Sequence, residues 1–114
     1  MNTHKIGKKL EKFVSDYLKV VDNKAKPTKA SGASTQIGDI LNKYFFVECK
    51  KRYTENITVK SKVWQKLCSE IPLESLKIPL YVLQNAKNET FAVLDLKDFI
   101  ELIKVYYQKY EEDK

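Results

Sequence analysis

Residues 38–50 read GDILNKYFFVECK, and this stretch decides the expected fold of the chain. Apolar runs at residues 36–41 and 44–52 flank Asn42 and Lys43, so the pattern predicts a β-hairpin that turns at these two residues. Successive side chains of a strand point to opposite faces, so such a hairpin divides its residues between a buried face and a second face.

The charged residues of the predicted hairpin gather on its second face. Alternation along the second strand places Glu48 and Lys50 on the face opposite to Cys49. A symmetric turn pairs Asp39 with Phe46, which makes Asp39 and Glu48 diagonal neighbours about 7–8 Å apart at the backbone. Two carboxylates this close can converge on one hard divalent cation, and Mg²⁺ prefers such oxygen ligands. Lys50 can then activate a metal-bound water or stabilise charge on a phosphate.

The rest of the chain supplies helices and further strands around this hairpin. Amphipathic helices are predicted at residues 4–21, 60–71 and 96–110, the last capped by Asp95. Residues 79–84 and 90–94 indicate buried central strands, and a short edge strand is expected in the polar stretch before the hairpin. The expected order is αβββαββα, an α/β fold with helices flanking a mixed central sheet. The tyrosine-rich last helix is expected to pack against that sheet, with an interface as the second choice.

The composition indicates one basic domain. The chain has 114 residues, 43% of them hydrophobic, which is enough for one core. Lys and Arg number 21 against 15 Asp and Glu, and the net charge of +6 is typical of a phosphate-binding protein. Since Arg52 is the only arginine, we expect contacts to a nucleic-acid backbone more than to base edges.

The cysteines and the single histidine argue against a zinc protein and a disulfide scaffold. Cys49 and Cys68 lack CxxC spacing, and His4 cannot complete a zinc site with them. No apolar run approaches the ~20 residues of a membrane span, and the lysine-rich start lacks the apolar region of a signal peptide. We therefore expect no membrane contact and a cytoplasmic location in a bacterium, an archaeon or a phage-infected host.

The charged residues of the hairpin also resemble a known motif. Gly38-Asp39, a gap of eight residues and then Glu48-Cys49-Lys50 resemble the PD-(D/E)xK nuclease superfamily, which includes archaeal Holliday-junction resolvases and small phage nucleases. Gly38 stands where the motif usually has Pro. The resemblance implies one restriction-endonuclease-like domain over residues 1–114.

The resemblance also implies an activity and a set of site residues. It implies hydrolysis of DNA by a Mg²⁺-dependent endonuclease, with Mn²⁺ able to substitute, and most plausibly a resolvase of four-way junctions that acts as a homodimer. Asp39, Glu48 and the main-chain carbonyl of Cys49 would be metal ligands, and Lys50 the catalytic lysine. In the family a helix before the hairpin supplies a further acid, which here matches Glu11 as a ligand through water.

A set of basic and polar residues is expected to bind the nucleic acid. Ser31, Gly32 and Ser34 resemble a Ser-Gly segment of the resolvase branch, and the basic residues would form a phosphate-binding rim. Gln65 stands where related nucleases often place a polar residue near the site. The expected nucleic-acid-binding residues are Lys8, Lys9, Ser31, Gly32, Ser34, Lys51, Arg52, Lys60, Lys62 and Gln65.

Simpler interpretations remain open beside this one. Glu48 and Lys50 can form an ordinary ion pair on an exposed strand, and Glu11 can balance the lysines of its own helix. The functional alternatives are a nickase or restriction-like nuclease of the same fold, and a catalytically silent nucleic-acid-binding module. A small structural or inhibitory protein is a third, and it would bind no divalent ion.

Overall fold

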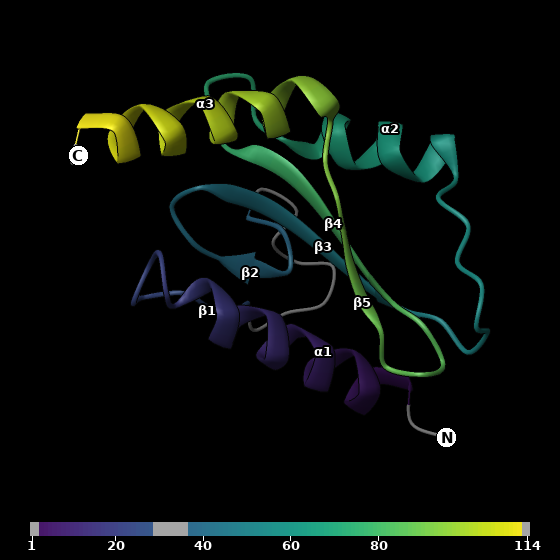
Figure 1. Cartoon of the computed structure of the whole chain (residues 1–114). Helices are drawn as coiled ribbons and strands as arrows, with labels where there is room; N and C mark the ends of the chain where they lie inside the picture. The colour runs from purple at the N-terminus through teal and green to yellow at the C-terminus, as the bar shows by residue number, and fades with distance from the viewer. Residues whose placement is uncertain (1–2, 29–36, 113–114) are drawn as a thin grey trace.

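The computed structural model describes residues 3–28 and 37–112, and its elements follow the predicted order αβββαββα (Figure 1). The helices are α1 (Thr3–Leu18), α2 (Ser61–Glu70) and α3 (Leu96–Glu112). The strands are β1 (Lys26–Pro27), β2 (Ile40–Leu41), β3 (Phe45–Lys51), β4 (Ile78–Gln84) and β5 (Thr90–Val93). None of the described helices combines the length and the apolarity that crossing a membrane requires.

A three-stranded mixed sheet in the order β3-β4-β5 forms the centre of the protein. β3 and β4 run parallel, with Phe45 beside Ile78 and Lys51 beside Gln84, and α2 makes the crossover that a parallel pair needs. β4 is central and mostly buried, as predicted. β5 pairs antiparallel with β4 at the edge of this sheet, where Phe91 is 47% exposed. The prediction of a buried central strand is therefore wrong for β5.

Two apolar clusters hold α1 and α2 against opposite faces of the sheet (Figure 1). The cluster on the α1 face includes Leu10, Val14, Leu18, Val47, Leu80 and Val82. The cluster on the α2 face comprises Phe46, Leu67, Tyr81 and Leu83, with Trp64 packed against it. Phe46 and Val47 thus point to opposite faces, which confirms the predicted alternation of β3 and the predicted core role of Trp64.

The predicted hairpin is wrong, because its two strands pair with different partners. β2 pairs antiparallel with β1, and β3 pairs with β4. Between the two predicted runs the described backbone makes one isolated bridge, of Gly38 with Val47, and this bridge is parallel. Instead of pairing with Phe46, Asp39 donates its N–H to the Val47 carbonyl at 2.7 Å.

The Asn42 side chain explains why no tight hairpin forms at this turn. Asn42 is buried, and its amide donates to the carbonyls of Ile40 and Phe45 at 3.1 and 3.0 Å. Its Oδ1 accepts from the N–H groups of Tyr44 and Phe45 at 2.9 and 2.7 Å. These bonds take the place of a backbone ladder across the turn, so β3 is free to leave β2 and pair with β4.

Gly38 permits the close approach of its segment to β3. Its φ is +81°, and a Cβ at this position would lie 2.8 Å from the Val47 carbonyl oxygen. Proline, the usual residue here in the PD-(D/E)xK motif, fixes φ near about −65° and cannot adopt this conformation. The departure from the motif is therefore required by the backbone of this chain.

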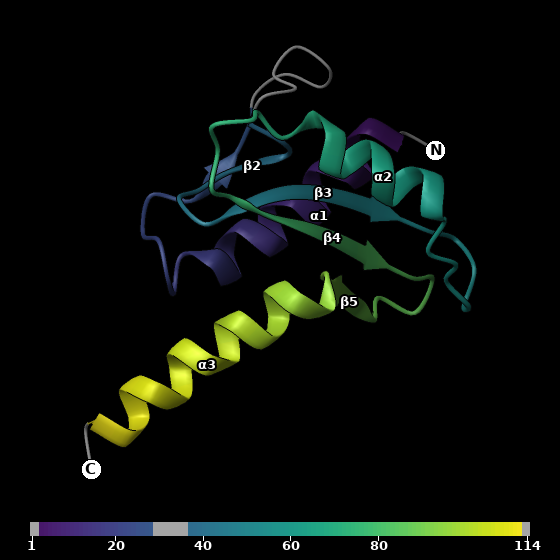
Figure 2. The same ribbon diagram turned by 90° about the horizontal axis from the view of Figure 1, so that it is seen from above.

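α3 runs outward from the edge of the sheet, so the predicted packing of this helix on the sheet is wrong. Its start is capped as predicted, because the Asp95 Oδ1 accepts from the Lys97 N–H at 2.9 Å. No residue from Leu96 to Glu112 is buried, and Figure 2 shows the helix leading away from β5. An amphipathic pattern predicts that a helix face needs cover, but it does not identify the partner.

Gly38→Ala is expected to destabilise the protein by about 2 kcal/mol or more, because a positive φ costs a residue with a Cβ about 1–2 kcal/mol and the Val47 backbone blocks the added atom. Urea unfolding measures the change. The control is Gly7→Ala in α1, where a Cβ meets no described atom within 4 Å and a gain of about 0.5–1 kcal/mol is expected. Wild-type stability in Gly38→Ala would contradict the close approach.

Candidate functional site

Three acidic side chains from separate segments lie within electrostatic reach of one another beside β3. Glu48 lies in β3, Asp39 follows the bridge of Gly38 with Val47, and Glu11 lies on α1 within electrostatic reach of both. The Asp39 Oδ2 accepts a hydrogen bond from the Cys49 N–H at 2.8 Å, which holds this carboxylate against β3. The structure thus brings Asp39 and Glu48 together along a different backbone path from the predicted hairpin.

Lys50 is the cation next to this group of acids. Its Nζ lies 3.3 Å from the Glu48 Oε1, and both side chains are only partly exposed. The simple ion pair considered from the sequence is therefore present in the structure. A plain surface pair would not, however, have Asp39 and Glu11 beside it, and these two acids are what make this location a candidate site.

The acids are poorly solvated and repel one another. Burial, followed by the nearby Asp39 and Glu48 carboxylates, raises the pKa of Glu11 from 4.5 to about 7. Burial also raises the pKa of Asp39, although the Cys49 N–H and Lys50 partly offset this effect. The pKa of Glu48 is raised by burial and then by Asp39. An additional positive charge would relieve this repulsion, so the group has the electrostatics of a cation site.

Glu70 is a site residue that the sequence did not indicate. It ends α2, and its charge contributes to the raised pKa values of Asp39 and Glu48. Its side chain is 29% exposed and lies 4.0 Å from the Lys66 Nζ. The helical period could have indicated Glu70, because Glu70 follows Val63 by two turns and so lies on the same side of α2, which packs toward the sheet.

Thr28 positions the segment that carries Asp39. Its hydroxyl donates to the Gly38 carbonyl at 3.0 Å and to the Asp39 carbonyl at 3.3 Å, and its N–H donates to the latter at 3.0 Å. No sequence motif pointed to this residue. The contacts span ten or more positions, so only the folded chain reveals them.

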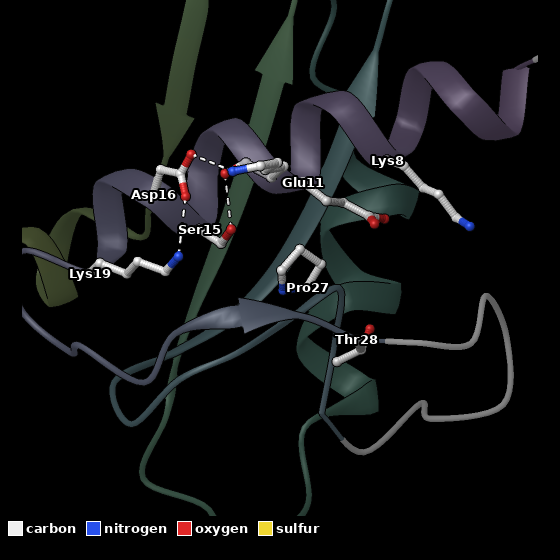
Figure 3. Close-up of a pocket in the computed structure, with 8 residues that line it drawn as sticks. Lys8, Glu11, Ser15, Asp16, Lys19, Pro27 and Thr28 are labelled. Atoms are coloured by element: carbon white, nitrogen blue, oxygen red, sulfur yellow. Dashed lines mark hydrogen bonds and ion pairs between the residues drawn. The ribbon is translucent and has the colours of Figure 1, made fainter.

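A groove of about 470 Å³ lies between α1 and β1, and Glu11 is one of the residues that line it (Figure 3). It is lined by Lys8, Glu11, Lys12, Ser15, Asp16, Lys19, Pro27 and Thr28. Lys12 and Lys19 both pair with Asp16, at 3.0 and 3.3 Å. Glu11 is electrostatically coupled to Asp39 and Glu48, and Thr28 hydrogen-bonds to the Asp39 carbonyl. The groove that these two residues line therefore adjoins the candidate metal site.

The residues predicted to bind nucleic acid are scattered over the protein. Lys8 lines the groove, whereas Lys9 is exposed on α1 outside it, and Ser31, Gly32 and Ser34 lie outside the described residues. The Lys51 Nζ donates to Gln84, Asn85 and Asn88 at 2.6–3.0 Å, which occupies its ammonium in the turn after β4. The Arg52 N–H donates to the Gln84 carbonyl.

The three other predicted residues lie in α2 or directly before it. Lys60 and Lys62 are exposed at this end, and the Gln65 amide donates to the Ser61 hydroxyl at 3.3 Å. Glu70, at the opposite end, lies about 15 Å along the helix from Lys60, since each helical residue advances about 1.5 Å. Lys60 and Lys62 therefore lie toward the other end of α2 from Glu70.

The donor atoms suit a hard cation that keeps part of its water. Within residues 3–28 and 37–112, no three His, Cys, Asp or Glu side chains are grouped so as to hold a metal ion by themselves. Mg²⁺ is commonly held by one or two carboxylates and several waters, and Asp39 and Glu48 can provide these carboxylates. The Cys49 carbonyl is a further oxygen donor. Its thiol is not, because burial raises the thiol pKa and keeps it protonated.

Comparison with protein-family models, with curated proteins and with solved structures gave no significant match.

Glu11→Gln is expected to stabilise the metal-free protein at about pH 8 and to leave its stability unchanged at about pH 4. The pKa of Glu11 is raised from 4.5 to about 7 in the folded state, so wild-type stability falls as the pH rises through this window. Glutamine mimics the protonated acid and avoids the loss, which is about 1 kcal/mol or less because the side chain is partly exposed. Melting temperatures measured against pH in EDTA test this expectation.

The control for this experiment is Asp16→Asn, for which the expected change in stability has the opposite sign. Hydrogen bonds from Lys12 and Lys19 lower the pKa of Asp16, so its charge favours folding above its ordinary pKa. Asp16→Asn should therefore lower stability at about pH 8. The same stability change in Glu11→Gln at both pH values would contradict the electrostatic coupling of Glu11.

Proposed function

We propose that this protein is a metal-dependent endonuclease that hydrolyses DNA phosphodiester bonds, and specifically a structure-specific resolvase of four-way junctions. One observation carries the proposal, namely that Asp39, which the Cys49 N–H holds against β3, and Glu48, 3.3 Å from the Lys50 Nζ, are poorly solvated acids whose charges also raise the pKa of Glu11. Desolvated carboxylates that repel one another are unfavourable for stability, and such arrangements are typical of functional sites. The resemblance of the Asp39, Glu48 and Lys50 spacing to PD-(D/E)xK nucleases supports the same activity.

Each residue then has a defined role. Asp39 and Glu48 would hold Mg²⁺ with the Cys49 carbonyl, and Glu11 would act through a water. A bound Mg²⁺ would supply a water of lowered pKa and a Lewis acid for the phosphate. Lys50 would stabilise negative charge that develops on the phosphate, because its Nζ lies next to a proposed metal ligand, 3.3 Å from the Glu48 Oε1. The Cys49 N–H keeps Asp39 in place through its 2.8 Å hydrogen bond.

The groove along α1 is the proposed path of a DNA strand. Lys8, Lys12 and Lys19 line it, and lysines hold a phosphate backbone without reading the bases. Glu11 borders the same groove, so a strand that lies in it brings its phosphates toward the acids. Binding of this kind follows the shape of the DNA, as a junction-specific enzyme requires. Two symmetric cuts in a four-way junction would need two copies of the chain.

Asp39→Asn and Glu48→Gln are each expected to lower Mg²⁺-dependent cleavage about 100-fold or more, because several kcal/mol of transition-state stabilisation depend on the ligated metal. The measurement is cleavage of labelled four-way junctions, flaps, single strands and plain duplex. Both substitutions preserve side-chain size, so unfolding is not expected. The control is Glu55→Gln, which removes an exposed acid paired with Lys87 at 2.7 Å beyond the end of β3.

The outcomes of this assay separate the candidate functions. Undiminished cleavage by both site variants would reject the proposed site. Equal cutting of all four substrates would leave a nuclease of the nickase or restriction-like kind and reject the resolvase. Binding of DNA without cleavage under any divalent metal would favour the silent nucleic-acid-binding module.

Lys8→Gln is expected to weaken DNA binding similarly for all sequences and to reduce the slope of log affinity against log salt by about 1. Lys62→Gln is the matched control, because this exposed lysine lies on α2 and does not line the groove along α1. Fluorescence anisotropy over a range of salt concentrations measures both effects. A larger loss in Lys62→Gln than in Lys8→Gln would place the DNA outside the groove along α1.

A further inference from the structure

One acid, Asp16, lies in the groove along α1 among the lysines on which the proposed DNA path depends. Its two carboxylate oxygens bind different lysines, because Oδ2 accepts from the Lys12 Nζ at 3.0 Å and Oδ1 accepts from the Lys19 Nζ at 3.3 Å. Figure 3 shows Asp16 and Lys19 at the end of the groove opposite to Lys8. A single carboxylate thus holds two ammonium groups together at the groove.

The two ammonium groups are arranged as they would be around a phosphate of a nucleic-acid backbone. A phosphodiester, like a carboxylate, shares one negative charge between two oxygens that only accept hydrogen bonds. Lysine binds a phosphate as a point charge on a flexible stem, so its contact needs no fixed plane. Lys12 and Lys19 can therefore bind a phosphate in place of Asp16 without any change in the backbone of α1.

We propose that Lys12 and Lys19 form a binding site for one phosphate of the DNA backbone, and that Asp16 occupies this site in the free protein. A strand that enters the groove takes the two ammonium groups from Asp16. The Asp16 carboxylate then turns to solvent, to which its side chain is already 49% exposed. The site rests on the proposed DNA-binding function of the groove, and Asp16 acts in it as an internal competitor of DNA.

The charge balance of the groove indicates how Asp16 affects DNA binding. Three lysines and two acids line the groove, so its net charge is +1 when both acids are ionised, although the chain as a whole carries +6. Exposed ion pairs contribute little to stability, so a phosphate can displace Asp16 from its lysines. The displaced pairs nevertheless reduce the gain from each phosphate contact. Asp16 therefore weakens the binding of DNA without preventing it.

The proposed phosphate site lies at a defined distance from the candidate metal site. Asp16 follows Glu11 by five residues on α1, which is about 7.5 Å along the helix. The phosphates of one DNA strand follow one another about every 3.4 Å along the duplex axis. A strand along α1 with one phosphate at the acids therefore brings the phosphate about two nucleotides away to Lys12 and Lys19.

Asp16→Asn is expected to raise the affinity for DNA about fivefold, because it removes the competing charge and preserves side-chain size. The measurement is fluorescence anisotropy of a labelled four-way junction in EDTA, which prevents metal-dependent cleavage. The matched control is Glu55→Gln, which removes an exposed acid that pairs with Lys87 and does not line the groove. This control should change the affinity by less than about twofold. Circular dichroism checks that both variants are folded.

The gain in affinity should depend on the two lysines of the site. In the Asp16→Asn background, Lys12→Gln and Lys19→Gln should each remove most of the gain and reduce the slope of log affinity against log salt by about 1. Lys9→Gln in the same background is the control, since Lys9 is exposed on α1 and does not line the groove. It should leave most of the gain in place.

A scan of the DNA backbone locates the contact. One phosphate at a time is replaced by an uncharged methylphosphonate, and the affinities of wild type and Asp16→Asn are compared at each position. The gain from Asp16→Asn should disappear at one phosphate, about two nucleotides from the cut that Mg²⁺ produces in the same DNA. Equal gains at all positions would reject a single phosphate contact.

The affinities also separate this site from the proposed nuclease function. The site is rejected alone if wild type binds DNA and Asp16→Asn binds it no better. It is likewise rejected by an equal gain in Glu55→Gln, which would reduce the effect to net charge, or by a gain that survives Lys12→Gln and Lys19→Gln. Failure of wild type and Asp16→Asn alike to bind any DNA would reject the proposed function together with the site.

Discussion

The hydrogen bond from the Cys49 N–H to the Asp39 carboxylate fixes the geometry of the candidate site. On the side of β3 that faces away from β4, Val47 and Cys49 present backbone groups that need partners, as at any sheet edge. Asp39 satisfies both, because its N–H bonds to the Val47 carbonyl and its side chain accepts from Cys49. The positive φ of Gly38 makes this approach possible. One residue thus covers the edge of the sheet and offers a carboxylate to the site.

This arrangement disfavours the folded state, because the partly buried acids repel one another. Glu11, Asp39, Glu48 and Glu70 place four carboxylates in a region where Lys50 lowers the pKa of the first three and Lys8 also lowers that of Glu11. A chain selected for stability alone would replace some of these acids, since like charges in a poorly solvated site disfavour the folded state. Their presence together is therefore a physical argument for a cation, and it stands apart from any motif.

The sequence predicted the parts of the fold that depend on long periodic patterns. The amphipathic periods of α1 and α2 and the alternation of β3 are repeated often enough to determine which residues are buried. The prediction of a hairpin failed because the Asn42 side chain hydrogen-bonds to four backbone groups at the turn. A pairing rule based on residue spacing does not take such side-chain bonds into account. The prediction that α3 packs on the sheet failed because an apolar pattern is compatible with any apolar partner. Asp39, Glu48 and Lys50 were found through spacing, and the helical period of α2 could have indicated Glu70, whereas Thr28 required the folded chain.

The parallel pairing of β3 with β4 has a consequence for how the chain acquires its site during synthesis. β3 takes its continuous hydrogen-bonded partner from residues that follow the whole of α2. A nascent chain that ends before β4 therefore has Glu11, Asp39, Glu48 and Lys50 but no sheet to hold them. Loop-closure entropy makes such non-local pairing slow and late. The acids can converge only when the C-terminal part of the fold is in place, so an incomplete chain carries no assembled site.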